Sequence, residues 1–164
     1  MNLTVDKMRA GDWQAVRRIY QEGLETGQAT FETDVPSWEV WNSSKHIDGR
    51  LVAKSEDKIV GWAALSPVSK REVYAGVAEV SIYVTTAVRG EGIGKLLLRA
   101  LVEASEQAGI WTLQASVFPE NETSVALHAA CGFRIVGQRE HIARHHGVWR
   151  NTILLERRSQ QVGR

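Results

Sequence analysis

The stretch from Val80 to Ala104 constrains the fold more than any other part of this chain. A β-branched run over Val80–Val84 is followed by the glycine-rich sequence Arg89-Gly90-Glu91-Gly92-Ile93-Gly94, where a helix pattern begins at once. Apolar residues of this helix recur at the spacing of one buried face: Ile93, Leu96, Leu97, Ala100, Leu101 and Ala104. The pattern predicts a strand, a tight glycine loop and a helix packed against the core.

The glycine-rich loop has the properties of an anion-binding site. Three glycines before a helix let the backbone approach a ligand closely, and the first N–H groups of the helix stay free. The helix dipole adds partial positive charge there, and Arg89 and Lys95 add two full charges. We therefore expect the loop to cradle a phosphate. The alternative is that the glycines form only a tight turn.

Two widespread phosphate motifs do not fit this loop. A Walker A loop requires a glycine at the position of Arg89 and a serine or threonine at the position of Leu96. A dinucleotide fingerprint requires Gly-x-Gly-x-x-Gly, and here the third glycine comes one residue early. The loop therefore belongs to another class of phosphate site.

The composition is that of one globular domain over residues 1–164. The chain is 43% hydrophobic and 24% charged, which suits a sizeable core. A formal net charge of +1 gives no electrostatic reason to expect nucleic acid or a membrane surface as a partner. No apolar run approaches the roughly 18 residues of a membrane span, and no signal peptide is visible. The single cysteine, Cys131, fits a reducing cytoplasm.

Periodicity and turn residues predict the order β-α-α-β-β-β-α-β-α-β-β. The predicted strands are 2–7, 51–53, 59–65, 74–84, 110–118, 133–142 and 148–155. The predicted helices are 12–24 with Asp12 as N-cap, a short one capped by Ser37, one from the glycine loop to Gly109, and 121–131. The helix between the fourth and fifth strands requires a parallel crossover, whereas the hairpins require antiparallel pairs. We therefore expect an α/β fold with a mixed sheet and a ligand beyond the fourth strand's C-terminal end.

Glu79 is the carboxylate most suited to chemistry. It interrupts an apolar strand, and period-2 alternation places it on one face with Val77, Ser81 and Tyr83. A carboxylate in the middle of a strand next to a phosphate cradle can act as a general base for an amine, because desolvation raises its affinity for protons. The alternative is a glutamate on the solvent face of the strand.

A second group of residues follows the fifth predicted strand. Its pattern is Asn121-x-x-Ser124-x-x-Leu127-His128-x-x-x-Gly132-Phe133. Together with Arg89-x-x-Gly92-x-Gly94, it resembles the signature of the GNAT acyltransferases. The resemblance implies the acyl-CoA N-acyltransferase fold, a mixed and mostly antiparallel sheet with helices on both faces, and acetyl-CoA as co-substrate.

The same resemblance assigns roles to particular residues. The coenzyme pyrophosphate would meet the loop Arg89, Gly90, Glu91, Gly92, Ile93, Gly94 and Lys95. The pantetheine arm would pair with the main chain of Ile82, Tyr83 and Val84 and contact Asn121 and Ser124. In the family, a tyrosine at the position of His128 can protonate the departing thiolate. Here His128 would take that catalytic role or only touch the coenzyme.

Over nearly the whole chain the closer resemblance is to the phosphinothricin and methionine sulfoximine N-acetyltransferases. The matching segments are 29–33, 78–84, 127–133 and 146–149. This subgroup commonly has histidine at the position of His128, and its members are commonly homodimers. The resemblance implies a small-molecule amine as substrate, with a pocket formed by Phe31, Glu32, Thr33, Arg71 and Tyr74.

The expected function is therefore acetyl-CoA-dependent N-acetylation of a small amino acid analogue, with Glu79 as base and Cys131 dispensable. The alternatives are acetylation of a protein N-terminus or a polyamine, or non-catalytic coenzyme A binding. No metal is expected, because His141 and His145 have i, i+4 spacing on a predicted hairpin, where this spacing does not align them.

Overall fold

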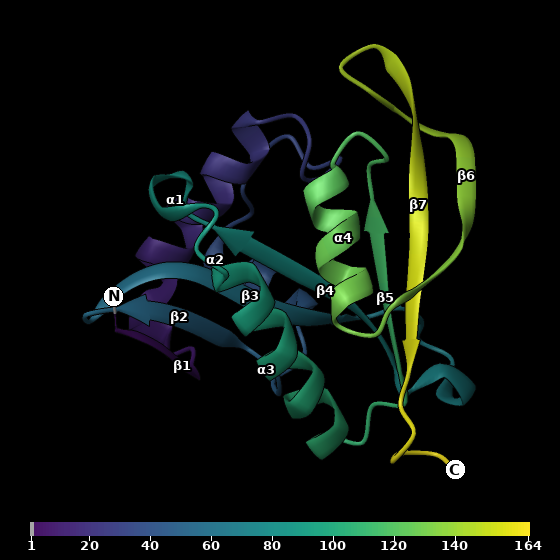
Figure 1. Cartoon of the computed structure of the whole chain (residues 1–164), viewed down its shortest axis with the longest axis horizontal. Coiled ribbons are helices and arrows are strands. Elements are labelled where there is room, and N and C mark those ends of the chain that lie inside the picture. Colours follow the sequence, from purple (N-terminus) through teal and green to yellow (C-terminus); the bar gives the residue numbers. More distant parts are fainter. Residues whose placement is uncertain (1) are drawn as a thin grey trace.

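The computed structural model describes residues 2–164 and contains seven strands, four α-helices and three short 3₁₀ turns (Figure 1). The strands are β1 Leu3–Lys7, β2 Leu51–Ser55, β3 Lys58–Pro67, β4 Val77–Val84, β5 Thr112–Val117, β6 Arg134–His145 and β7 Val148–Arg158. The helices are α1 Trp13–Glu25, α2 Trp38–Ser44, α3 Ile93–Gln107 and α4 Glu122–Ala130. The 3₁₀ turns are Ala10–Asp12, Glu72–Tyr74 and Thr86–Val88. None of the helices within residues 2–164 is long and apolar enough to cross a bilayer.

All seven strands form one sheet in the order β1-β2-β3-β4-β5-β7-β6. The β4–β5 pair is parallel, because α3 carries the chain back between these two strands, and every other pair is antiparallel. The mixed, mostly antiparallel sheet with a single parallel crossover is therefore confirmed.

The helices cover both faces of the sheet, and each face has its own core. On one face, Leu97, Leu98 and Leu101 of α3 belong to a core that contains residues of β2, β3, β4 and β5. On the other face, α1 and α2 enclose Trp41 and Trp62, which are 0% and 1% exposed. The buried face predicted for α3 was wrong at one position, because Leu96 is 37% exposed and Leu98, which was not predicted, is buried.

Several predicted element ends differ from those in the structure. The strand predicted from Tyr74 begins at Val77, because residues 72–74 form a 3₁₀ turn and Gly76 packs directly against the Trp111 ring. Asp12 occupies the N-cap position of α1, as predicted, but its side chain makes no capping bond; its carboxylate accepts a hydrogen bond from the Arg9 N–H at 2.8 Å. The final hairpin is tighter than predicted, because β6 extends to His145 and the turn contains only two residues.

Strands β4 and β5 are paired over a short distance and then separate. Only Val77, Ala78 and Glu79 have partners on β5, namely Thr112, Leu113 and Gln114. Beyond Glu79, β4 stays paired with β3 while β5 stays paired with β7. Figure 1 shows the two strands diverging from their shared end, with α4 lying over the gap. The fold therefore opens the middle of the sheet at Glu79.

Candidate active site

A cavity of about 870 Å³ lies where β4 and β5 separate. Its walls come from β4, the glycine loop, the end of β5, the start of α4 and the segment before Phe31. Many of the residues predicted from sequence line it: Glu79, Ile82, Tyr83, Val84, Arg89, Gly90, Gly92, Ile93, Gly94, Lys95, Asn121, Ser124 and His128. Glu91 is exposed and does not line it. The fold thus brings together two motifs that are far apart in the sequence.

The glycine loop presents free N–H groups to this cavity. Gly90 and Gly92 have φ angles of 85° and 79°, in the left-handed region that favours glycine. Within residues 2–164, the N–H groups of Gly90, Gly92, Gly94 and Lys95 have no hydrogen-bond acceptor. The first backbone bond of this turn runs from Leu96 N–H to Gly92 C=O at 3.1 Å. Free N–H groups at a helix start fit a phosphate.

Glu22 of α1 holds the chain segment between β4 and this loop. Its carboxylate accepts hydrogen bonds from the Thr86 N–H at 2.9 Å and from the hydroxyls of Thr85 and Thr86 at 2.9 and 3.0 Å. Burial alone would raise the pKa of Glu22, but these bonds and the charge of Arg18 lower it overall. The glycine loop is therefore anchored to α1 by a charged contact that the motif does not contain.

The open edge of β4 supplies a second type of contact. Residues 80–84 are paired on one side with β3, and within residues 2–164 they have no strand partner on the other. An extended ligand with amide groups can pair there as an added strand. The pantetheine arm of coenzyme A has this character, so the free edge and the free N–H groups together fit the coenzyme expected from the sequence.

Glu79 lies at the closed end of the cavity, where the strands separate. It is half-buried, and its Oε1 accepts a hydrogen bond from Gln114 Nε2 at 3.1 Å. Gln114 is its register partner on β5, and Ser66 is its partner on β3. The side chains of cross-strand partners share one face of a sheet, which here is the face that α1 and α2 cover. The side chain of Glu79 is thus positioned by a neutral donor. Within residues 2–164, no cationic group lies within 4.0 Å of its carboxylate.

His128 borders the same cavity from α4 and is 4% exposed. Its Nδ1 lies 2.7 Å from the carbonyl oxygen of Ser124, and its ring contacts Phe133 edge-on. Burial lowers the pKa of His128, although the Ser124 carbonyl partly opposes this. A carbonyl oxygen can only accept, so Nδ1 carries the hydrogen, and the neutral ring has its lone pair on Nε2.

Asn121 has a structural role in addition to its place in the cavity wall. It is the N-cap of α4, since its side-chain oxygen accepts a hydrogen bond from Ser124 N–H at 3.2 Å. Its Nδ2 donates to the Gln28 carbonyl at 3.4 Å, which ties α4 to the segment before Phe31. Asn121 therefore both caps α4 and lines the cavity.

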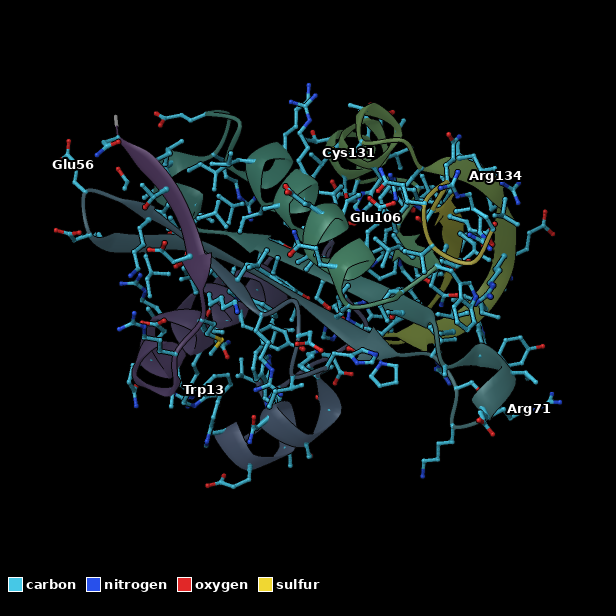
Figure 2. All side chains as sticks on the ribbon, turned by 90° about the horizontal axis from the view of Figure 1, so that it is seen from below. Trp13, Glu56, Arg71, Glu106, Cys131 and Arg134 are labelled. Atoms are coloured by element: carbon cyan, nitrogen blue, oxygen red, sulfur yellow. The ribbon has the colours of Figure 1, made fainter. Side chains whose placement is uncertain are left out.

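The residues expected to bind the amine substrate do not line the large cavity. Phe31 packs edge-on against Phe118 and His145, whereas Glu32 and Thr33 are exposed. Arg71 lies 5.4 Å from the centre of the Tyr74 ring, outside the large cavity. Figure 2 shows Arg71 at the outer edge of the molecule, pointing away from the sheet.

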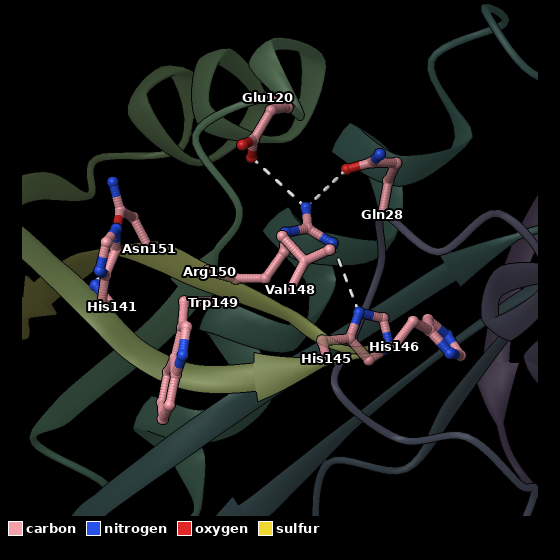
Figure 3. A pocket seen from close by; sticks show the side chains of 9 residues that line it. All are labelled: Gln28, Glu120, His141, His145, His146, Val148, Trp149, Arg150 and Asn151. Carbon is pink, nitrogen blue, oxygen red and sulfur yellow. Dashed lines mark hydrogen bonds and ion pairs between the residues drawn. The ribbon is translucent and has the colours of Figure 1, made fainter.

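A second, smaller cavity of about 400 Å³ lies beside the last hairpin (Figure 3). Arg150 of β7 is at its centre and donates to the Gly27 carbonyl and Gln28 Oε1, at 2.9 and 2.8 Å. Its guanidinium also stacks over Phe118 at 3.7 Å. Arg150 therefore fixes the segment before Phe31 to β7, and no sequence motif indicated this contact. Within residues 2–164, no three His, Cys, Asp or Glu side chains gather as a metal site.

Comparison with known proteins agrees with this geometry. Residues 13–133 match the acetyltransferase (GNAT) family. The chain is 33% identical to phosphinothricin N-acetyltransferase of Alcaligenes faecalis over 94% of this chain and 81% of that protein. It is 25% identical to L-methionine sulfoximine/L-methionine sulfone acetyltransferase of Pseudomonas paraeruginosa, over 91% of this chain and 90% of that protein.

One similar protein of known structure was solved with acetyl-CoA bound. The GNAT phosphinothricin acetyltransferase of Sinorhizobium meliloti, determined in complex with acetyl-CoA, is 29% identical and has a TM-score of 0.86. The similarity covers 99% of this chain and 91% of that one. The similarity therefore extends through both cavity motifs and the final hairpin.

Proposed function

Since the chain belongs to the acetyltransferase (GNAT) family and is an acetyl-CoA-dependent N-acetyltransferase, we propose that it acetylates the α-amino group of a small amino acid analogue. Phosphinothricin and methionine sulfoximine are the acceptors that the names of its relatives suggest. The observation that carries the proposal is the half-buried carboxylate of Glu79 where β4 and β5 separate, beside the cavity that suits the coenzyme.

Glu79 acts as the general base in this proposal. The substrate reaches the enzyme mainly as an ammonium ion, and the carboxylate takes one proton from it, directly or through a water molecule. The free amine then forms a C–N bond with the acetyl carbonyl carbon, and the C–S bond breaks, so that coenzyme A leaves as a thiolate. The nitrogen gives up its second proton, which the thiolate takes up directly or through a water molecule. Both steps need the amine close to Glu79 and the thioester in the gap between the strands. No covalent enzyme intermediate is involved.

The coenzyme supplies an acetyl group activated as a thioester. Its pyrophosphate would lie against the free N–H groups at the start of α3, with Arg89 and Lys95 contributing charge. Its pantetheine arm would pair with the open edge of Ile82, Tyr83 and Val84. Ser124 and Asn121, on the opposite wall, complete the site.

His128 is assigned a contact role and not that of an acid. Burial lowers the pKa of His128 and so favours the neutral ring, although the Ser124 carbonyl partly opposes this; the same carbonyl accepts the hydrogen that Nδ1 carries. A neutral imidazole accepts through Nε2, so this atom is suited to receive a hydrogen bond from the coenzyme thiol or from a water molecule.

We also propose that the protein is a cytoplasmic homodimer. Five apolar residues spread along β6 and β7 are between 44% and 59% exposed, and a second copy of the chain would cover part of this surface: Ile135, Val136, Ile142, Val148 and Trp149. Arg71, Tyr74, Phe31, Glu32 and Thr33 remain the candidates for the acceptor side of the pocket, which a dimer would complete.

The test is release of free thiol from acetyl-CoA with a panel of amines. The panel contains phosphinothricin, methionine sulfoximine, methionine sulfone, glutamate, spermidine and a short peptide. We expect turnover with the amino acid analogues and little with spermidine or the peptide. Turnover confined to spermidine or the peptide would replace the proposed acceptor and leave the family assignment intact.

A further inference from the structure

Lys45 is a cation near Glu79 that no motif indicated. It follows the last residue of α2, and its Nζ donates to Ser66 Oγ at 3.0 Å. Ser66 is the register partner of Glu79 on β3, and Gln114 bonds Glu79 from β5. The side chains of Lys45, Ser66, Glu79 and Gln114 therefore form a row across the face of the sheet that α1 and α2 cover.

The ammonium of Lys45 is half-buried without a partner of opposite charge. Burial lowers the pKa of Lys45, the charges of Glu79 and Glu32 oppose this effect, and Arg50 adds to it. Within residues 2–164, neither glutamate lies within the 4.0 Å that defines an ion pair with Lys45. An ammonium has three donors, and Ser66 accepts from one of them. A half-buried cation with free donors suits an anion that comes from outside the chain.

An α-amino acid has the matching arrangement of charges. Its carboxylate is separated from its nitrogen by a single carbon atom. When the amino nitrogen of the substrate is near Glu79, the α-carboxylate of the substrate must also lie close to Glu79. Glu79 repels this α-carboxylate, and Lys45 attracts it. Arg71, the anion partner expected from sequence, is stacked over Tyr74. Neither Arg71 nor Lys45 is among the residues that line the large cavity, but Lys45 bonds Ser66, the register partner of the cavity residue Glu79.

We propose that Lys45 binds the α-carboxylate of the acceptor, so that the enzyme selects amines that carry a carboxylate beside the amino group. This inference rests on the proposed function, because it assumes that Glu79 receives the proton of the acceptor. It makes Lys45 a substrate-binding residue and separates free amino acids from peptides and polyamines, whose reacting amines have no neighbouring carboxylate.

The test compares two acceptors that differ only in this group, L-methionine sulfone and its carboxamide. Thiol release is measured for the wild type, Lys45→Met, Lys45→Gln and Lys45→Arg. We expect the wild type to prefer the carboxylate through KM by roughly 10- to 100-fold, the range of a charge-assisted bond. Both neutral variants should lose this preference, with the KM for the carboxamide and for acetyl-CoA changed less than about threefold. Lys45→Arg should retain much of it.

The matched control is Lys58→Met, which removes the same charge at the exposed start of β3. It should keep the wild-type preference. If Lys45→Met and Lys45→Gln lose activity equally with both acceptors, Lys45 has a structural or base-tuning role and the inference is overturned. If the wild type acetylates neither acceptor nor any analogue in the panel, the proposed function itself is wrong. This outcome differs from a wild type that is active but shows no preference that depends on Lys45.

Discussion

Glu79 is the residue on which the chemistry depends. We expect Glu79→Gln to lower kcat by roughly 10²–10⁴-fold near neutral pH, because an amide cannot take the ammonium proton. The KM for acetyl-CoA should change little, since Glu79 is near the start of β4, whereas the glycine loop follows the other end of this strand. The measurement is steady-state thiol release. The defect should shrink at alkaline pH, where the amine loses its proton unaided, and a near-normal rate at neutral pH would refute the base assignment.

His128 makes a prediction about pH and stability. Its pKa in the folded protein is lowered, mainly by burial, so the unfolded chain binds a proton more readily below about pH 6.5. The free energy of unfolding should therefore fall as the pH drops through this value. His128→Gln should lose less stability than the wild type between about pH 7.5 and 5.5. Urea unfolding at both pH values measures the difference.

An equal loss of stability in the two proteins would show that His128 is not held neutral by the fold. His145 has a lowered pKa as well, from burial together with His146 and Arg150, and contributes with the same sign. It is present in both proteins, so the comparison isolates His128.

Single residues were predictable from the sequence where a motif names them. Gly92, Asn121 and His128 belong to such motifs, and all three line the cavity. Lys45, Gln114 and Arg150 belong to none. They reach their positions through the end of a short helix and through strand register, which no local pattern in the sequence encodes.

At the scale of elements, the contact between α1 and the end of β4 supports the glycine loop. We expect Glu22→Ala to lower the free energy of unfolding by about 1–3 kcal/mol, because the Thr86 N–H and two hydroxyls lose their acceptor. The KM for acetyl-CoA should rise roughly fivefold to tenfold, equivalent to about 1 kcal/mol, while the KM for the amine stays unchanged. Chemical unfolding and steady-state kinetics measure the two effects.

The matched control is Glu25→Ala, which changes an exposed glutamate of the same helix; among residues 2–164, its side chain accepts a hydrogen bond only from Gln21. It should leave both quantities close to those of the wild type. A similar rise in the KM for acetyl-CoA in both variants would mean that the charge of α1, and not the anchor, is responsible.

Element identity followed from periodicity, whereas element ends often did not. The strand around Glu79 alternates clearly, but its start depends on the contact between Gly76 and Trp111, which are far apart in the sequence. The N-cap of α4 was predictable, because the capping bond joins the Asn121 side chain to the N–H of Ser124, three residues further along the chain. The capping bond predicted for Asp12 is absent, since its carboxylate accepts a hydrogen bond from the N–H of Arg9, which precedes it in the chain.

At the scale of the molecule, the site is a consequence of strand order. The parallel crossover places β5 beside β4, and beyond Glu79 β5 is paired with β7 alone. The sequence indicated the crossover through α3. The length over which β4 and β5 stay paired depends on the packing of the whole sheet, so the gap itself could not be predicted.

The exposed apolar residues of β6 and β7 lead to a prediction about assembly. We expect the wild type to have the mass of two chains of 18.3 kDa each in light scattering, because Trp149, Val148 and Ile142 are each at least 50% exposed. Trp149→Ala should shift the mass toward one chain at equal concentration, since buried aromatic residues dominate interfaces. Ile47→Ala, at a residue that is 83% exposed outside the hairpin, should leave the mass unchanged. Dissociation by Ile47→Ala instead would place the interface on the face of α2, and a wild type with the mass of one chain would exclude the dimer.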